Sequence, residues 1–150
     1  MTAILDKAHL LRHARNTYHG AVALQNATKP IPAAYLAQIA LECAFKARIL
    51  GLYHCSRLST FKDKHPDLWD KIFKGKNGHD LGGLSQEAVW PRLCITLGKE
   101  SPLTGNVWNR IKSKEPERPY SLRYGMENLS LPEAQEELDL CDIVLAMVEA

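Results

Sequence analysis

The amino-acid sequence predicts an all-α protein of about four or five helices. Apolar residues recur at steps of three and four in several segments, which is the spacing of one face of a helix. No segment shows the sustained alternation that a half-buried strand needs. A chain of 150 residues can bury one hydrophobic core without disulfides or metals. We therefore expect a single helical domain over residues 1–150.

Two long helices are expected in the first third of the chain. The first extends from about Thr2 to Leu24 and has a weak apolar stripe. The second begins after Pro30 and Pro32 and ends near Gly51. Its core-facing stripe is formed by Leu36, Ile39, Ala40, Cys43, Ala47 and Leu50.

The remaining helices are marked by prolines and capping residues. Pro66 lies in the first turn of a short helix that ends near Phe73, and a further helix is expected from about Leu81 to Leu93. The last helix has the clearest start, because Ser130, Pro132 and Glu133 form the pattern of a capping box with a proline in the first turn.

Charge is distributed unevenly along the chain. Residues 1–126 contain all 19 lysines and arginines and 10 acids, whereas residues 127–150 contain 7 acids and no base. A basic body of this kind attracts nucleic acid or nucleotide phosphates, and an acidic helix can pair with a basic partner. Two solvated helix faces of opposite sign are the alternative interpretation.

The sequence gives no reason to expect a membrane segment, a metal or a cofactor. Charged residues or histidines interrupt every apolar run, so we expect neither a signal peptide nor a membrane span, and we expect a cytoplasmic protein. Asp6, His9 and His13 share a helix face but have no further ligands nearby, which favours a solvated face over a metal site. The four cysteines lack zinc-like or disulfide-scaffold spacing and are expected to be reduced thiols.

Polar residues follow the second helix at intervals of four. Gln38, Glu42 and Lys46 lie on one face, with the glutamate before the lysine, which is the favourable order for a side-chain pair. Further along, the segment GKNGHDLGGL at residues 75–84 has four glycines around His79 and Asp80. It lacks the Gly-Lys-Ser/Thr end of a phosphate-binding loop, so we interpret it as a corner with a capping aspartate.

These motifs occur in the order of a known family. The stretch AAYLAQIALECAFKARI, the corner GHDLGGL and the pair Arg123-Tyr124 ahead of the helix PEAQEELDLCDIVLAMV resemble the HEPN domain, the higher-eukaryote and prokaryote nucleotide-binding helical bundle. The resemblance covers nearly the whole chain and implies an up-and-down bundle. It also implies a ligand-binding set of Glu42, Lys46, His79, Arg123 and Tyr124, and a homodimer.

The resemblance implies nucleotide or RNA binding. It further implies a partner protein such as a nucleotidyltransferase, in a toxin–antitoxin or antiviral defence pair. Many HEPN proteins are metal-independent ribonucleases with an arginine and a histidine ahead of the final helix. This chain departs from that pattern because no histidine follows His79. Earlier matches, Arg12 to His19 and Arg48 to His54, lie in the wrong helices.

Three functions therefore stay open. The first is nucleotide or RNA binding without catalysis, and the second is a ribonuclease toxin in which His79 is a weak catalytic candidate beside a cation such as Arg123 or Lys46. The third is a non-catalytic interaction or inhibitor protein that binds a basic partner through its acidic last helix. A structural alternative has His79 hydrogen-bonded to a neighbouring helix and Arg123 paired with Glu42.

Overall fold

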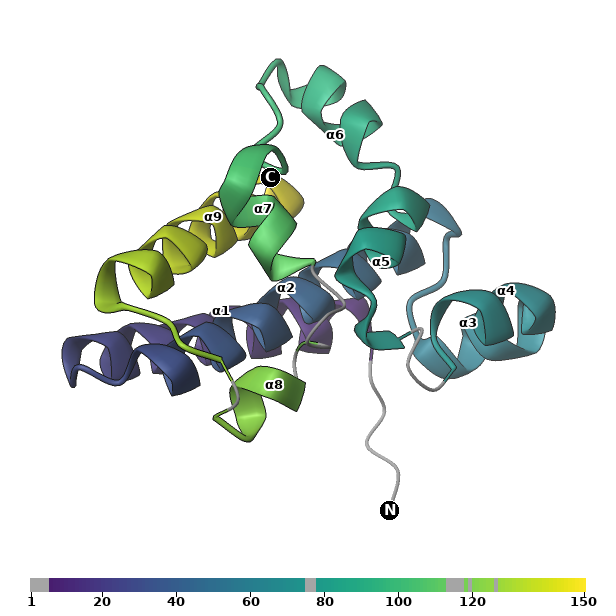
Figure 1. Ribbon diagram of the computed structural model, residues 1–150. Helices are drawn as coiled ribbons and strands as arrows, with labels where there is room; N and C mark the ends of the chain where they lie inside the picture. Colours follow the sequence, from purple (N-terminus) through teal and green to yellow (C-terminus); the bar gives the residue numbers. More distant parts are fainter. Residues whose placement is uncertain (1–5, 75–77, 113–117, 119, 126) are drawn as a thin grey trace.

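A computed structural model of the chain describes residues 6–74, 78–112, 118, 120–125 and 127–150, and within them it confirms the all-α class (Figure 1). These residues form no strand, and Asp6 and Arg57 make an isolated bridge. The described helices outnumber the expected four or five because short segments lie between the long ones. They are α1 (Lys7–Asn26), α2 (Pro30–Leu52), α3 (Leu58–Lys64), α4 (Pro66–Ile72), α5 (Leu81–Glu87), α6 (Trp90–Leu97), α7 (Gly105–Ile111), α8 (Tyr120–Arg123) and α9 (Leu131–Glu149).

Helices α1, α2 and α9 form the centre of the molecule. A short link joins α1 to α2, and α9 returns to pack against both of them, as Figure 1 shows. Helix α1 begins at Lys7, where the carboxylate of Asp6 accepts a hydrogen bond from the His9 amide. The residues expected to start this helix at Thr2 lie outside the described part. At α9 the predicted capping box is present, formed by Ser130 and Glu133.

Helix α2 is buried on several sides rather than along one stripe. Its buried residues include six alanines, and a helix that is apolar all round belongs in a core. Neighbours cover it on different faces, namely α1, α9, α5 and α8. Near its middle, Phe45 is fully buried and meets the rings of Trp90 and Trp108 edge-on. Helix α2 is therefore the element on which side chains from distant segments are positioned.

The predicted continuous helix from Leu81 to Leu93 is wrong, because the chain breaks at Val89. Helix α5 ends at Glu87 and α6 begins at Trp90, with Pro91 in its first turn. A proline inside a continuous helix would remove a hydrogen bond and clash with the preceding turn, whereas the first turn tolerates it. Val89 has a left-handed backbone, with φ 50° and ψ 56°. That conformation is strained for a β-branched residue.

We predict that Val89→Gly stabilises the protein by about 1 kcal/mol, because glycine adopts left-handed backbone without the steric cost that other residues meet. Val89 is 40% exposed, so little packing is lost. Urea unfolding followed by circular dichroism measures the change. Ile95→Gly is the matched control, since Ile95 is 81% exposed but lies within α6. This control should destabilise the protein by about 1 kcal/mol, and a loss of stability in both variants would contradict the strain at Val89.

All four cysteines are buried and carry free thiols. Burial raises the pKa of the Cys43 thiol to about 11, and the neighbouring charge of Glu42 adds to the shift. These thiols thus behave as small apolar core residues. Among the described helices, none combines the length and the apolar composition that a membrane span requires. In the same residues, no His, Cys, Asp and Glu side chains gather in a group of three or more that could hold a metal.

Candidate functional site

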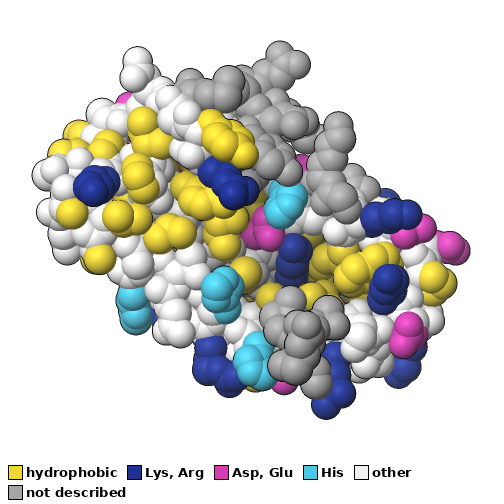
Figure 2. Space-filling model, turned by 90° about the horizontal axis from the view of Figure 1, so that it is seen from below, with side chains coloured by type: hydrophobic (Ala, Val, Ile, Leu, Met, Phe, Trp, Pro, Cys, Tyr) yellow, Lys and Arg dark blue, Asp and Glu magenta, His cyan; other side chains and the backbone are white. Residues whose placement is uncertain are grey.

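Three of the five residues predicted as a ligand-binding set meet in one cluster. Glu42 and Lys46 lie one turn apart on α2, and the Lys46 Nζ atom donates to Glu42 Oε2 at 2.9 Å. The other oxygen, Oε1, lies 2.7 Å from Nδ1 of His79, which comes from the corner before α5. Figure 2 shows that histidine, acidic and basic side chains lie next to one another near the middle of the face that it draws. Glu42 therefore joins a helix to a corner 37 residues away.

Exposure rises across this cluster from the glutamate to the histidine. The side chains of Glu42 and Lys46 are 10% and 17% exposed, and that of His79 is 40% exposed. The carboxylate thus lies at the base of the cluster and the imidazole reaches the surface. The cluster thus places the His79 imidazole at the surface, with the ammonium of Lys46 partly buried beside the same carboxylate.

Close packing fixes the corner that carries His79. A Cβ atom on Gly78 would lie 2.6 Å from the carbonyl oxygen of Phe73 and 3.6 Å from Lys46 Nζ, so no larger residue fits there. After the corner, the carboxylate of Asp80 accepts from the Gly83 amide and caps α5, as the sequence predicted. Residues 78–84, the described part of the glycine-rich segment, therefore form a tightly packed corner that holds His79 against α2.

The contact between Glu42 and His79 determines what the imidazole can do. Because the carboxylate already accepts from Lys46, it acts as an acceptor, and the Nδ1 proton of His79 points toward it. A carboxylate at Nδ1 orients the ring and leaves Nε2 on the outward side, which is the arrangement in many acid–base sites. The same arrangement also suits a purely binding role, because the outward nitrogen of an oriented ring can form a hydrogen bond with a ligand.

The other two predicted residues, Arg123 and Tyr124, lie at the end of α8. Both are exposed, and the guanidinium of Arg123 lies 5.7 Å from the centre of the Tyr124 ring. Helix α8 packs on the first half of α2, where Leu122 shares a small core cluster with Ala34 and Tyr35. The seven residues from Tyr35 to Glu42 correspond to about 10 Å along α2. Among the ion pairs of the described residues, Glu42 is paired with Lys46 and His79, so the suggested pairing with Arg123 is not made.

A second group of charges, which the sequence interpretation missed, lies under α9. The Arg118 side chain is 1% exposed and binds two carboxylates, those of Glu127 and Glu137. Arg110 adds a bond from Nε to Glu137 at 2.8 Å, and Ser121 bonds to Glu127. Two arginines and two glutamates neutralise one another here. We interpret this network as structural.

The two glutamates overcome the effect of burial on Arg118. Burial lowers the pKa of this guanidinium, but hydrogen bonds with Glu137 and then Glu127 raise the pKa overall. A signal in the sequence could have revealed the network. Glu137 stands within the apolar stripe of the last helix, between Ala134 and Cys141, and an acid in such a stripe requires a buried partner.

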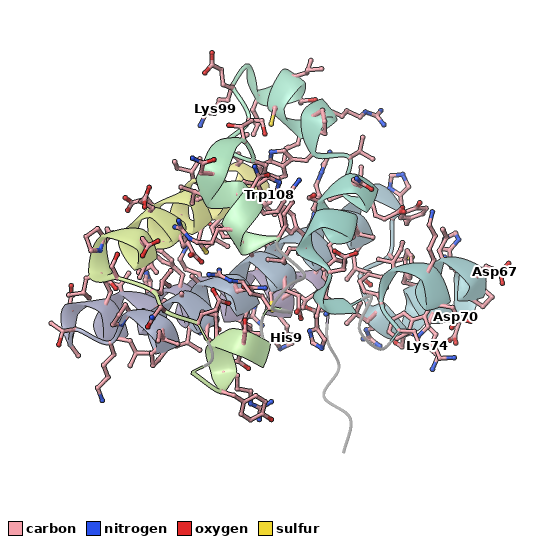
Figure 3. All side chains as sticks on the ribbon, in the orientation of Figure 1. His9, Asp67, Asp70, Lys74, Lys99 and Trp108 are labelled. Atoms are coloured by element: carbon pink, nitrogen blue, oxygen red, sulfur yellow. The ribbon has the colours of Figure 1, made fainter. Side chains whose placement is uncertain are left out.

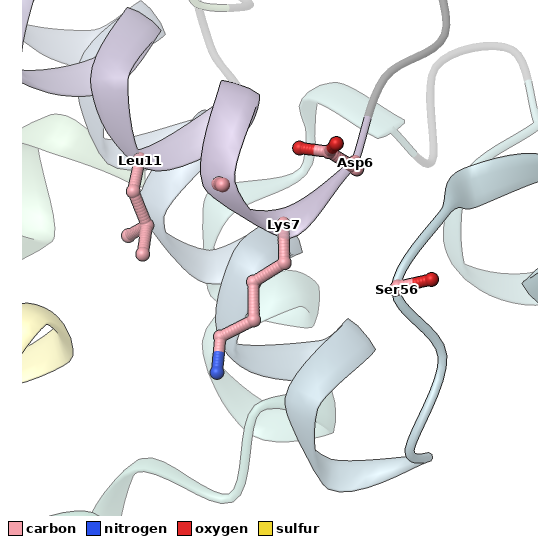
Figure 4. A pocket seen from close by; sticks show the side chains of 5 residues that line it. Asp6, Lys7, Leu11 and Ser56 are labelled. Carbon is pink, nitrogen blue, oxygen red and sulfur yellow. The ribbon is translucent and has the colours of Figure 1, made fainter.

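Two hollows outside the cluster are open to solvent. One, of about 400 Å³, lies at the start of α1 between Lys7, Leu11 and Ser56 (Figure 4). Lys7 has a structural explanation there, because its ammonium lies near Gly51 at the carboxyl end of α2. The other, of about 230 Å³, lies between α5, α6 and α7 and is lined by Trp90 and Trp108. Neither hollow is lined by Glu42, Lys46 or His79.

Comparisons with known proteins do not identify the chain. No protein-family model, no curated protein and no solved structure matches it. The HEPN resemblance therefore stays a prediction from the order of motifs in the sequence.

Proposed function

We propose that this chain is a HEPN-like protein that binds nucleotide or RNA on the face formed by the middle of α2, the corner at His79 and α8. The observation that supports this most is the cluster of Glu42, Lys46 and His79, which two distant segments assemble at the surface. A cation and an imidazole at hydrogen-bonding distance from one carboxylate suit a phosphate group that competes for the same donors.

Helix α8 extends this face in a way that favours a nucleic-acid ligand over inorganic phosphate. Tyr124 is 68% exposed and lies beside the Arg123 guanidinium. An exposed aromatic ring next to an arginine offers a stacking surface for a base and a cation for its phosphate. Since α8 packs about 10 Å along α2 from Glu42, a ligand that reaches both groups must be longer than one phosphate.

The cluster also supports a second candidate, a metal-independent ribonuclease. Such an enzyme needs a proton acceptor for the 2′-hydroxyl and a cation for the developing phosphorane charge. His79 oriented by Glu42 would provide the first, and Lys46 the second. We favour binding because no histidine follows His79 in the sequence to complete the family's catalytic pattern.

The third candidate, an interaction protein with an acidic last helix, has less support. Much of the negative charge of α9 is paired within the chain. Arg15 binds Asp142 at 2.9 Å and Glu149 at 3.0 Å, and Arg110 and Arg118 bind Glu137. The biological setting that we propose, a cytoplasmic homodimer in a two-component toxin–antitoxin or antiviral system, rests on the family resemblance. Light scattering of the purified chain tests the dimer.

We predict that Lys46→Gln and Arg123→Ala each weaken the binding of a short single-stranded RNA by about ten- to a hundredfold, because each removes a charge-assisted contact. Fluorescence anisotropy with a labelled RNA, repeated at two salt concentrations, measures the affinity and the contribution of phosphate contacts. ADP in place of RNA shows whether a free nucleotide suffices.

Lys99→Gln is the matched control for these variants. Lys99 is exposed and lies at the end of the molecule away from α8 (Figure 3), so its loss should change affinity less than about twofold. Equal effects of all three substitutions would reject a specific face. To separate the two leading functions, the same RNA is incubated in the presence of a chelator, once with the wild type and once with His79→Ala. Cleavage by the wild type alone would establish the ribonuclease.

A further inference from the structure

Arg48 lies on a different side of α2 from the cluster. It follows Lys46 by two residues, which corresponds to a rotation of about 200° around the helix. Its Nε atom donates to the carbonyl oxygen of Ala88 at 3.3 Å, and the side chain is partly buried. The guanidinium is thus held at the junction of α5 and α6, where the described residues accept a hydrogen bond from one of its donors, Nε.

A second arginine approaches the same junction. The left-handed backbone at Val89 ends α5 and turns the chain into α6, and Arg92 lies in the first turn of α6 with its amide bonded to the Val89 carbonyl. Its side chain is exposed. Burial first, and then the positive charge of Arg92, lower the pKa of Arg48. Arg48, through its bond to Ala88, and Arg92, through its bond to Val89, therefore bring two positive charges to the same junction.

No carboxylate compensates these charges in the part of the chain that the structure describes. The ion pairs formed there include neither Arg48 nor Arg92. The acid nearest to Arg92 in sequence, Glu87, pairs instead with Lys71 at 3.1 Å. Two cations near each other without an anion destabilise a fold, and a bound anion removes that cost.

We propose that Arg48 and Arg92 form a binding site for a phosphate group at the junction of α5 and α6. Two guanidiniums supply planar sets of donors that match phosphate oxygens in pairs, which lysines do not. The Ala88 carbonyl holds Arg48 in place, and the exposed Arg92 leaves the site open to solvent. The phosphate belongs either to a free nucleotide or to an RNA backbone. This site is separate from the Lys46 face and does not depend on its function.

Arg92→Gln tests the site by its melting temperature in the absence of a phosphate ligand and in the presence of one. In chloride buffer the variant should melt at a higher temperature than the wild type, because the repulsion is gone. Inorganic pyrophosphate, at matched ionic strength, should raise the melting temperature of the wild type, and its affinity for Arg92→Gln should be at least about tenfold weaker. Arg57→Gln removes the same charge from an exposed position elsewhere and should respond to pyrophosphate as the wild type does.

Two further arms identify the source of the phosphate and exclude a folding artefact. Arg48→Lys keeps the charge but loses the bond to Ala88, so it should fold and bind pyrophosphate more weakly. ADP and a short RNA are titrated separately against the wild type and Arg92→Gln. Weaker binding of either ligand by Arg92→Gln supports the site, and the ligand that is affected identifies the source of the phosphate. Equal pyrophosphate stabilisation of wild type and Arg92→Gln, or none in the wild type, overturns the proposal. Because Lys46 lies on another face of α2, its variants test the proposed function independently.

Discussion

Glu137→Ala is expected to destabilise the protein by about 3–5 kcal/mol, which is the cost of removing one partner from a buried ion pair. The Glu137 side chain is 2% exposed and accepts bonds from both Arg118 and Arg110. Without it, Arg118 stays buried with Glu127 as its remaining carboxylate, so the effect should lie toward the lower end of this range. Urea unfolding followed by circular dichroism measures the loss.

Glu136→Ala is the control for this network. Glu136 is 53% exposed and lies 3.7 Å from Arg110, so its contribution is that of a surface pair, about 0–1 kcal/mol. If the two substitutions had equal effects, the buried network would contribute no more than solvent-exposed charges do. Replacing Glu137 with glutamine would retain the shape and some of the hydrogen bonds, and should recover part of the stability.

Phe45→Ala should cost about 3–5 kcal/mol through the cavity that it leaves in the core. Phe45 is fully buried, and its ring centre lies 5.6 Å from that of Trp90 and 6.3 Å from that of Trp108. Figure 3 shows Trp108 between α7 and the region of α2 and α5. The substitution therefore loosens α6 and α7 from α2, and tryptophan fluorescence should change together with stability.

Ile143→Ala serves as the comparison for Phe45→Ala. Ile143 is 49% exposed on α9, so its truncation should change the free energy of unfolding by about 0.5 kcal/mol or less. A Phe45→Ala variant as stable as the Ile143 variant would mean that the aromatic packing around α2 is looser than the structure has it. The fluorescence change would then be absent as well.

The sequence predicts the long helices well because each carries several independent signals. Pro30 and Ser130 mark the starts of α2 and α9, and each helix has room for a repeating apolar pattern. The sequence does not indicate α3, α7 and α8, because segments of seven residues or fewer show barely two turns of any pattern and these three, unlike α4, have no proline in the first turn to mark a start. The apolar pattern alone does not indicate the break at Val89; its signal in the sequence is Pro91, which a helix tolerates in its first turn but not in its interior.

The candidate site was predictable in part. The spacing of Glu42 and Lys46 placed them together on one helix face. His79 was a candidate from its motif, but its contact with Glu42 spans 37 residues and depends on how the corner packs. The partner of Arg118 could not be identified from spacing, since Glu127 and Glu137 were two of seven acids in the last part of the chain. Contacts between segments that are distant in the sequence can be identified only once the fold is known.

The position of α9 has a consequence for how the chain folds. Helices α1 and α2 are neighbours in sequence and can pair as a local hairpin, which is fast because few residues separate the contacts. Helix α9 contacts the same pair from far along the chain, as in the bond from Cys141 to the Ala37 carbonyl across 104 residues. During synthesis, the part of the apolar α2 surface that α9 covers therefore remains exposed until α9 has left the ribosome. That interval is when the nascent chain is most exposed to aggregation and to chaperone binding.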